Sequence, residues 1–276
     1  MAPRWSEAGK HLGQVQDVQW SVRVIDAESR EELLAVSPDL MLPTASVGKL
    51  LLLIEVARQL ESGEWAPDTP LPRSPEDAVN DSGLWQHLTA DELSVHDLAT
   101  LVGVLSDNYA TNVLLRAVGL EAVATVTKTL GLQQTRLNDS VRDGRGAEHP
   151  PTLSVGTARE LTRLMADLHA DTALSPSVSA RVLGWLEAGA DLSMVAQPLG
   201  LDPLAHAGGD RGIRLWHKTG TDEGTRADVG LVSGPDATLV YAVLARWEPT
   251  GPDRRDEVLH AMHAVGVAVR DAVGLR

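Results

Sequence analysis

The chain has 276 residues, 43% of them hydrophobic, which is enough to form a substantial core in one large domain or two smaller ones. Its net charge is −14 and no basic cluster interrupts the acidic excess, so nucleic acid and anionic membranes are poor partners. The chain has no cysteine, which excludes disulfides, thiolate nucleophiles and Cys-ligated zinc.

The N-terminal stretch MAPRWSEAGKHLGQV contains no apolar segment of signal-peptide length. The longest uninterrupted aliphatic run, at 50–54, is far too short to span a bilayer. The sequence as given therefore predicts a cytoplasmic protein, or a secreted one if an export signal has been removed. Its oligomeric state cannot be deduced from these features.

Periodicity predicts the elements in chain order. Two strands are expected first, at 20–28 and 32–39, on either side of a short turn. Helical apolar spacing dominates the middle of the chain, over 46–61, 94–105, 109–118, 121–130, 154–169 and 176–188. Three further strands, at 214–222, 225–235 and 237–247, precede an amphipathic helix at 253–274.

Strands at both ends of the chain, with helices between them, predict a fold of the α/β (α+β) class. We expect one antiparallel five-stranded sheet built from both termini, flanked by helices, with an all-helical subdomain inserted in it. The single domain 1–276 would then consist of a sheet subdomain, 1–45 plus 211–276, and a helical subdomain, 46–210. A cleft is expected where the two parts meet.

The first candidate site residues stand at the start of the predicted helix 46–61. The chain has 20 arginines but only four lysines, so a lysine at a given position indicates that arginine does not suffice there. Arginine cannot lose its proton in a protein, whereas a desolvated lysine can. Lys49 follows Ser46 by three residues, on the same helix face, and precedes a nearly all-apolar run that should bury it and lower its pKa. The pair suits a serine nucleophile with an amine base.

Two further triplets accompany this pair. Ser106-Asp107-Asn108 falls in the turn between two predicted helices, where a hydroxyl and an amide can be aimed at one point. Lys218-Thr219-Gly220 falls on a predicted strand, and Lys218 is another of the four lysines in the chain. Each triplet alone is a weak signal, but all three motifs occur in order and in suitable structural context.

S-x-x-K, S-D-N and K-T-G are the signature motifs of class A β-lactamases and penicillin-binding proteins. The chain therefore resembles the class A β-lactamase superfamily of serine acyl hydrolases over nearly its whole length, which implies a β-lactamase-like fold. The resemblance also implies a role for each motif residue. Ser46 would be the nucleophile, Lys49 its base or proton relay, and Ser106 the group that passes a proton to the departing nitrogen.

Other residues would bind the substrate or hold these groups in place. Asn108 would hold Lys49 and the substrate's acyl-side amide, and Lys218 would position Ser106 and attract the substrate carboxylate. The backbone N–H groups of Ser46 and Thr221 would form the oxyanion hole. The residues expected to contact the substrate are Thr219, Gly220, Thr221 and Arg226.

The chain departs from the family pattern in the loop that follows. Class A enzymes carry a glutamate there that activates the deacylating water, but register with the flanking helices puts Val141 at its position. The loop is also several residues shorter. The titratable residues left in it are Asp139, Asp143, Glu148 and His149, for each of which a solvated loop position or a helix cap is the simplest interpretation. The groups for acylation are therefore present, and the group for deacylation is not evident.

These observations predict a serine hydrolase of small molecules that needs neither a cofactor nor a metal. The leading substrate is a β-lactam or a related carboxylate-bearing amide, hydrolysed slowly if the loop lacks its base. The first alternative is an esterase or small-amide hydrolase on the same scaffold. The second is a sensor or binding domain that is acylated and stays acylated.

Overall fold

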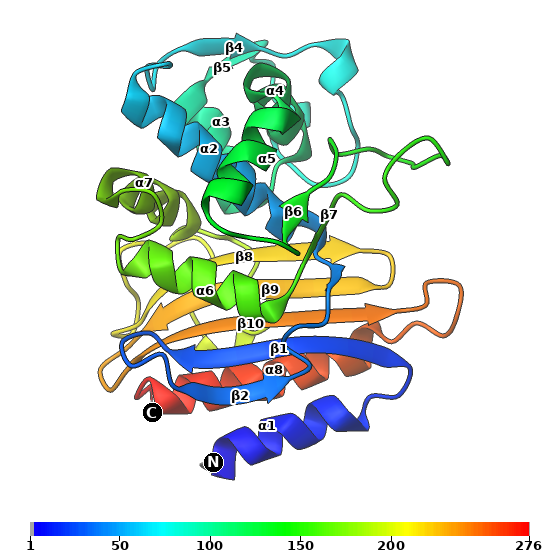
Figure 1. The fold of residues 1–276 in the computed structure, drawn as a ribbon, viewed down its shortest axis with the longest axis vertical. Helices are drawn as coiled ribbons and strands as arrows, with labels where there is room; N and C mark the ends of the chain where they lie inside the picture. The colour runs from blue at the N-terminus through cyan, green and yellow to red at the C-terminus, as the bar shows by residue number, and fades with distance from the viewer. Residues whose placement is uncertain (1–2, 276) are drawn as a thin grey trace.

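A five-stranded antiparallel sheet forms the centre of the protein (Figure 1). The computed structural model describes residues 3–275 and gives the strand order β2-β1-β10-β9-β8. The strands are β1 (Val18–Asp26), β2 (Glu32–Val36), β8 (Arg214–Asp222), β9 (Thr225–Ser233) and β10 (Thr238–Trp247). The first strand pairs with the last over its whole length, which confirms the predicted sheet built from both ends of the chain. Strand β8 forms one edge of this sheet.

Both faces of the sheet are covered by helices. On β10, Val240, Ala242 and Leu244 belong to a core shared with the inserted helices, whereas the residues between them belong to a second core with α1 and α8. This alternation follows from the two-residue period of a strand, and a sheet covered on both faces is apolar on both. In Figure 1, α6 (Ala158–His169) lies in front of the sheet and α8 (Arg255–Ala272) behind it.

Helix α1 (Pro3–Gln14) is absent from the sequence-based expectations. Trp5, Ala8 and Leu12 are buried against the α8 side of the molecule, and their spacing of three and four residues is that of an amphipathic helix. The helical spacing of apolar residues was therefore present in the sequence, but it comprised only these three positions. Neither α1 nor any other helix within residues 3–275 is long and apolar enough to cross a membrane.

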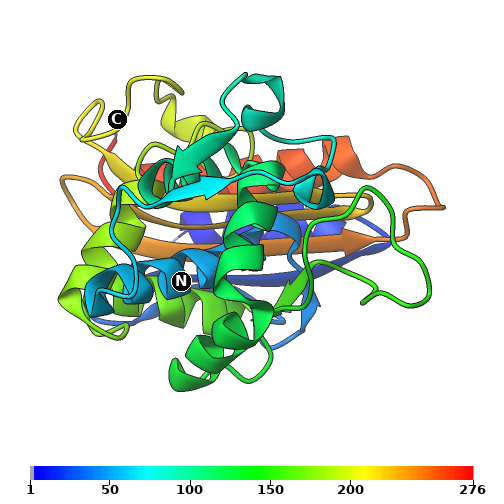
Figure 2. The same ribbon diagram turned by 90° about the horizontal axis from the view of Figure 1, so that it is seen from above.

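The region between β2 and β8 contains the helices that were expected there, but long irregular stretches separate them. Its further helices are α2 (Lys49–Ser62), α3 (Val95–Leu105), α4 (Asn108–Val118), α5 (Leu120–Thr129) and α7 (Pro176–Leu186). It also contains two short strands, β4 (Pro70–Pro72) and β5 (Glu92–Ser94), which an all-helical insert would lack. Seen from above, the cyan and green insert lies over the sheet (Figure 2). The division at 45/46 and 210/211 stays a prediction.

The predicted helix 154–169 is wrong at its start. Residues Ser154–Gly156 form strand β7, which pairs with β3 (Leu42–Pro43) and β6 (Arg136–Leu137). Helix α6 begins only after Thr157, whose side chain accepts a hydrogen bond from the N–H of Glu160 and so caps the helix. The small sheet joins the segment before Ser46 to the loop at 138–153, and so brings two distant parts of the sequence to one place.

Candidate active site

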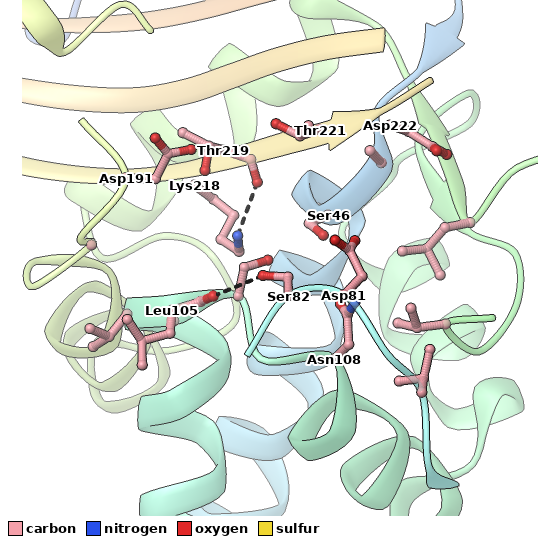
Figure 3. Close-up of a pocket in the computed structure, with 18 of the residues that line it drawn as sticks. Ser46, Asp81, Ser82, Leu105, Asn108, Asp191, Lys218, Thr219, Thr221 and Asp222 are labelled. Atoms are coloured by element: carbon pink, nitrogen blue, oxygen red, sulfur yellow. Dashed lines mark hydrogen bonds between the residues drawn. The ribbon is translucent and has the colours of Figure 1, made fainter. Parts of the chain in front are cut away.

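A cavity of about 750 Å³ opens between the helical insert and the edge strand β8 (Figure 3). Six of the predicted site residues line it: Ser46, Ser106, Asn108, Lys218, Thr219 and Thr221. They come from the turn before α2, the turn between α3 and α4, and β8. The cleft expected between the two parts of the fold is therefore present, and the three motifs meet in it.

Ser46 lies in a 3-10 turn, Ala45–Gly48, rather than in the first turn of the predicted α-helix, because α2 begins at Lys49. Ala45 has a φ of +46°, a conformation that non-glycine residues adopt at a cost and that occurs at functional sites. Ser154 stabilises this backbone, since its Oγ donates a hydrogen bond of 2.6 Å to Ala45 O. Packing against β7 therefore fixes the turn that holds Ser46.

Lys49 is fully buried beneath the cavity. Its Nζ donates hydrogen bonds to Ser106 O and to Asn108 Oδ1, both at 2.6 Å, and to Ser106 Oγ at 3.3 Å. Burial, and then the charge of Lys218, hold the pKa of Lys49 well below its usual 10.5, although Asp107 and Asp81 act in the opposite direction. This agrees with the sequence-based expectation for Lys49. Among residues 3–275, no hydrogen bond joins Lys49 to Ser46.

The Ser106-Asp107-Asn108 turn lies between α3 and α4, as predicted. Ser106 ends α3 in the left-handed conformation, with a φ of +56°. The buried carboxylate of Asp107 accepts hydrogen bonds from the N–H groups of Ala110, Leu84 and Trp85, at 2.6 to 2.9 Å. Asp107 thus caps α4 and attaches the preceding loop to it, so that Asn108 reaches Lys49 from a fixed backbone.

Lys218 lies on β8 and is buried at the cavity wall. Its Nζ donates a hydrogen bond of 3.0 Å to Thr219 O, and in the described part of the chain none joins it to Ser106, the contact that the family resemblance implies. Burial lowers the pKa of Lys218 to about 8, against the charges of Asp191 and Asp228, which favour the protonated amine. Lys218 is therefore a cation that titrates close to neutral pH.

Gly220 lets β8 approach the turn that holds Ser46. A Cβ at this position would overlap Thr44 O and would lie 3.1 Å from the backbone nitrogens of Ser46 and Val47. Glycine thus brings the backbone of β8 beside the Ser46 N–H, although Gly220 itself does not line the cavity. Thr219 and Thr221, on either side of Gly220, do line it.

The structure does not bring Arg226 to the cavity. Its guanidinium donates hydrogen bonds to Asp222 O and Thr225 O and lies 5.8 Å from the centre of the Trp247 ring. The side chain is buried in the sheet and is not among the cavity-lining residues. A substrate carboxylate in the cavity would meet Lys218, Thr219 and Thr221 instead.

Val141 lines the cavity in the loop at 138–153, and Asn112 holds its backbone from both sides. The N–H of Val141 donates to Asn112 Oδ1 at 2.9 Å, and Asn112 Nδ2 donates to Val141 O at 3.0 Å. An apolar side chain is thus fixed at the position where the family resemblance implies a glutamate.

The carboxylates of this loop either bind neighbouring side chains or do not line the cavity. Asp139 pairs with Arg142 and Arg145, both at 2.7 Å. Burial alone would raise the pKa of Asp139, but the hydrogen bonds from these arginines outweigh it and lower the pKa to about 2. Asp143 lines the cavity and accepts two hydrogen bonds of 2.8 Å from Asn80. Glu148 is exposed, 3.3 Å from His149, and does not line the cavity.

Sequence reasoning missed three carboxylates that also line the cavity: Asp81, Asp191 and Asp222. None belongs to a recognisable motif, and each stands in a loop or at a strand end, where no periodicity fixes its direction. Asp191 accepts hydrogen bonds from the N–H and Oγ of Ser193, and its charge favours the protonated form of Lys218. Only the assembled fold reveals these groups.

Comparisons with known proteins agree with the geometry. The model of a family described as the beta-lactamase enzyme family matches residues 6–273. No curated protein sequence matches the chain. Among solved structures, a β-lactamase from Sphaerobacter thermophilus is similar, with 26% identity and a TM-score of 0.86 over 99% of this chain and 98% of that one.

Two further structures are similar in fold. A mutant of PBP-A, in an acyl-enzyme complex with penicillin G, has 20% identity and a TM-score of 0.80 over 98% of this chain and 97% of that one. A β-lactamase from Xanthomonas campestris has 19% identity and a TM-score of 0.80 over the same shares. At these identities the likeness concerns the fold alone.

Proposed function

The chain belongs to the beta-lactamase enzyme family, and we propose that it forms an acyl-serine at Ser46 with a β-lactam or a related carboxylate-bearing amide and then hydrolyses it slowly. Family and fold support a hydrolase of the serine β-lactamase type. The observation that carries the finer proposal is the buried Lys49, bound to Ser106 and Asn108 beneath the cavity that Ser46 lines.

Acylation begins when neutral Lys49 takes the hydroxyl proton of Ser46 while Oγ attacks the carbonyl carbon. The lowered pKa of Lys49 supports this role, because an amine that stays protonated cannot accept a proton. The ring C–N bond then breaks. The proton passes from Lys49 through Ser106 Oγ, 3.3 Å away, to the leaving nitrogen.

Substrate binding in this proposal uses the β8 side of the cavity. The charged form of Lys218 attracts the substrate carboxylate, and the hydroxyls of Thr219 and Thr221 donate hydrogen bonds to it. The N–H groups of Ser46 and Thr221 stabilise the oxyanion, a contribution that is often the largest in acyl transfer. The close approach at Gly220 supports this pairing of N–H groups.

Release of the acyl group is the slow step in this proposal. Val141 supplies no base, Asp139 is held by two arginines, and Glu148 does not line the cavity. Loss of a positioned general base typically costs a factor of about 10² to 10⁴. A β-lactam should therefore give a stoichiometric burst followed by slow turnover.

Covalent labelling tests the proposal directly. Penicillin G or a fluorophosphonate should add one adduct per chain, and peptide mapping should place it on Ser46. Ser46→Ala should remove the adduct without changing the melting temperature. An adduct on Ser82 or Ser106, both of which line the same cavity, would refute the proposal.

An esterase is the second candidate. It is favoured because the carboxylates of the loop are bound to neighbouring side chains and supply no base for hydrolysis of a β-lactam acyl group. After ring opening, a β-lactam leaves a bulky fragment that obstructs water, whereas a simple ester leaves only its acyl group. Nitrocefin and p-nitrophenyl esters, assayed side by side, distinguish the two activities. A binding or sensor domain is the limiting case, in which time-resolved mass spectrometry of the intact protein would show an acyl-enzyme that never decays.

A further inference from the structure

Asp81 is a carboxylate at the nucleophile that belongs to none of the three motifs. It lines the cavity, and Figure 3 shows its side chain directed toward Ser46, on the far side of the cavity from Lys218 and Thr219. Its charge also acts on the buried Lys49 amine, which places the two groups within electrostatic range of each other. Asp81 therefore lies in the same cavity as the nucleophile of the proposed function, with its carboxylate directed toward that serine.

The backbone of Asp81 is held in an unusual conformation. Its φ is +75°, in the left-handed region that only glycine adopts freely. Gln86 Nε2 donates a hydrogen bond of 2.8 Å to Asp81 O, and the preceding Asn80 is bound to Asp143. The residue is thus fixed from both sides, so its side chain leaves the loop in a defined direction.

The carboxylate of Asp81 is free, unlike that of Asp139. Among residues 3–275, no ion pair or hydrogen bond within the protein engages the Asp81 side chain. A general base must have a lone pair available to a water molecule beside the acyl carbon. Within the cavity, Asp191 is engaged by Ser193 and Asp143 by Asn80, so Asp81 fits this requirement better than either.

We propose that Asp81 is the general base of the slow deacylation that remains when Val141 stands at the position of the loop glutamate. The proposal rests on the acyl-serine of the proposed function. The Asp81 carboxylate takes a proton from water as the water oxygen bonds to the acyl carbon. The tetrahedral intermediate then collapses, the bond from the acyl carbon to Ser46 Oγ breaks, and the proton returns from Asp81 to Oγ. The acyl group leaves as a carboxylic acid.

Asp81→Asn is the appropriate test because asparagine tolerates a positive φ and keeps the side-chain shape while removing the base. Pre-steady-state kinetics with penicillin G should show a burst of unchanged amplitude and an acylation rate within about threefold of the wild type. Hydrolysis of the acyl-enzyme, followed by intact mass, should slow by about 10²-fold. Formate should partly restore hydrolysis in Asp81→Ala, since it can occupy the vacated space.

Asp222→Asn is the matched control, because Asp222 is another exposed carboxylate that lines the cavity, at the end of β8. It removes the same charge and should leave deacylation within about twofold of the wild type, which separates a specific base from the general field of the cavity.

The outcomes distinguish the two proposals. If no adduct forms on Ser46 in the wild type, the proposed function itself fails. If the adduct forms and Asp81→Asn hydrolyses it as fast as the wild type, only the role of Asp81 fails. Slower acylation of Asp81→Asn, with the acyl-enzyme that forms hydrolysed as fast as in the wild type, would also overturn this role. That pattern belongs to a substrate-binding residue.

Discussion

The two walls of the cavity use their charged residues in opposite ways. On the amine wall, which we define as Ser106, Asn108 and Lys218 with Lys49 beneath them, neither lysine forms an ion pair with a carboxylate of the described residues. Both amines therefore remain available for proton transfer or binding. On the loop wall, residues 138–153, the principal buried carboxylate is neutralised by two arginines of the same loop. The first wall keeps its groups reactive, whereas the second uses them to hold its own shape.

The charged groups of the two walls therefore contribute to the free energy of folding with opposite signs. Burying an ammonium costs several kcal/mol, and the lowered pKa of Lys49 reflects that cost, which is typical of functional sites. Asp139 contributes stability instead. Its pKa falls from 3.8 to about 2 on folding, so its ionised form stabilises the protein by roughly 2 kcal/mol above pH 4, and this is lost as the pH falls through 2.

The largest expected effect concerns the amine wall. Lys49→Arg puts a permanent cation that cannot accept a proton in place of the base, so acylation by a β-lactam should slow by about 10³-fold. Lys218→Arg keeps a cation for the substrate carboxylate and should slow acylation by no more than about tenfold. Stopped-flow acylation rates measure both effects.

The two replacements are well matched, since both introduce the same larger side chain at a buried position. Melting temperatures should therefore fall to a similar degree. Equal acylation rates in the two variants would contradict the assignment of Lys49 as the base and of Lys218 as the cation that binds the substrate carboxylate.

A gain on the loop wall is the next largest effect. Val141→Glu places a carboxylate on a backbone that Asn112 already fixes at the cavity. Hydrolysis of the β-lactam acyl-enzyme should accelerate by about 10-fold to 10²-fold, the lower part of the range for a general base. Val141→Gln, which has the same shape without the base, is the control and should not accelerate it. A similar gain in both variants would point to a change in loop packing.

The pH dependence of acylation sharpens the role of Lys218. Its pKa of about 8 means that the amine is charged below pH 8 and loses its charge above. The second-order acylation rate for a carboxylate-bearing β-lactam should thus fall above pH 8, approaching about tenfold per pH unit. An ester without a carboxylate should lack this decrease, and Lys218→Arg should remove it for the β-lactam. A decrease of the same size for both substrates would assign it to another group.

Periodicity predicted most of the framework, because strand and helix signals are local. All five strands of the main sheet and the helices that carry the motifs were found this way, and the turn at Ser106 followed from the helices on either side. The boundary at Ser154 failed for a physical reason. Its pairing with β3 depends on a segment more than a hundred residues away, and this outweighs the helical pattern that follows it.

The site was predictable only where motifs carry it. Ser46, Lys49 and Lys218 could be named because serine and lysine at these spacings have a chemical meaning. Asp81 could not, since its direction depends on a positive φ and on contacts that Gln86 and Asp107 make only in the folded chain. Arg226 shows the reverse error: the resemblance implied a substrate contact, whereas the side chain turns to carbonyls of its own hairpin.

The smallest expected effect comes from replacing the remaining carboxylates of the loop wall, and it tests whether this wall takes part in catalysis. Asp143→Asn and Glu148→Gln should each leave β-lactam turnover within about twofold of the wild type. Both carboxylate oxygens of Asp143 already accept hydrogen bonds from Asn80, and an asparagine at this position can keep part of that interaction. Glu148 is exposed and lies beside His149. Steady-state and burst kinetics with nitrocefin measure the outcome, with Asp81→Asn as the comparison. Rapid linear turnover without a burst, abolished by either loop change, would show that a displaced carboxylate has taken over. The contrast between the two walls would then no longer hold, because both would supply groups to the reaction.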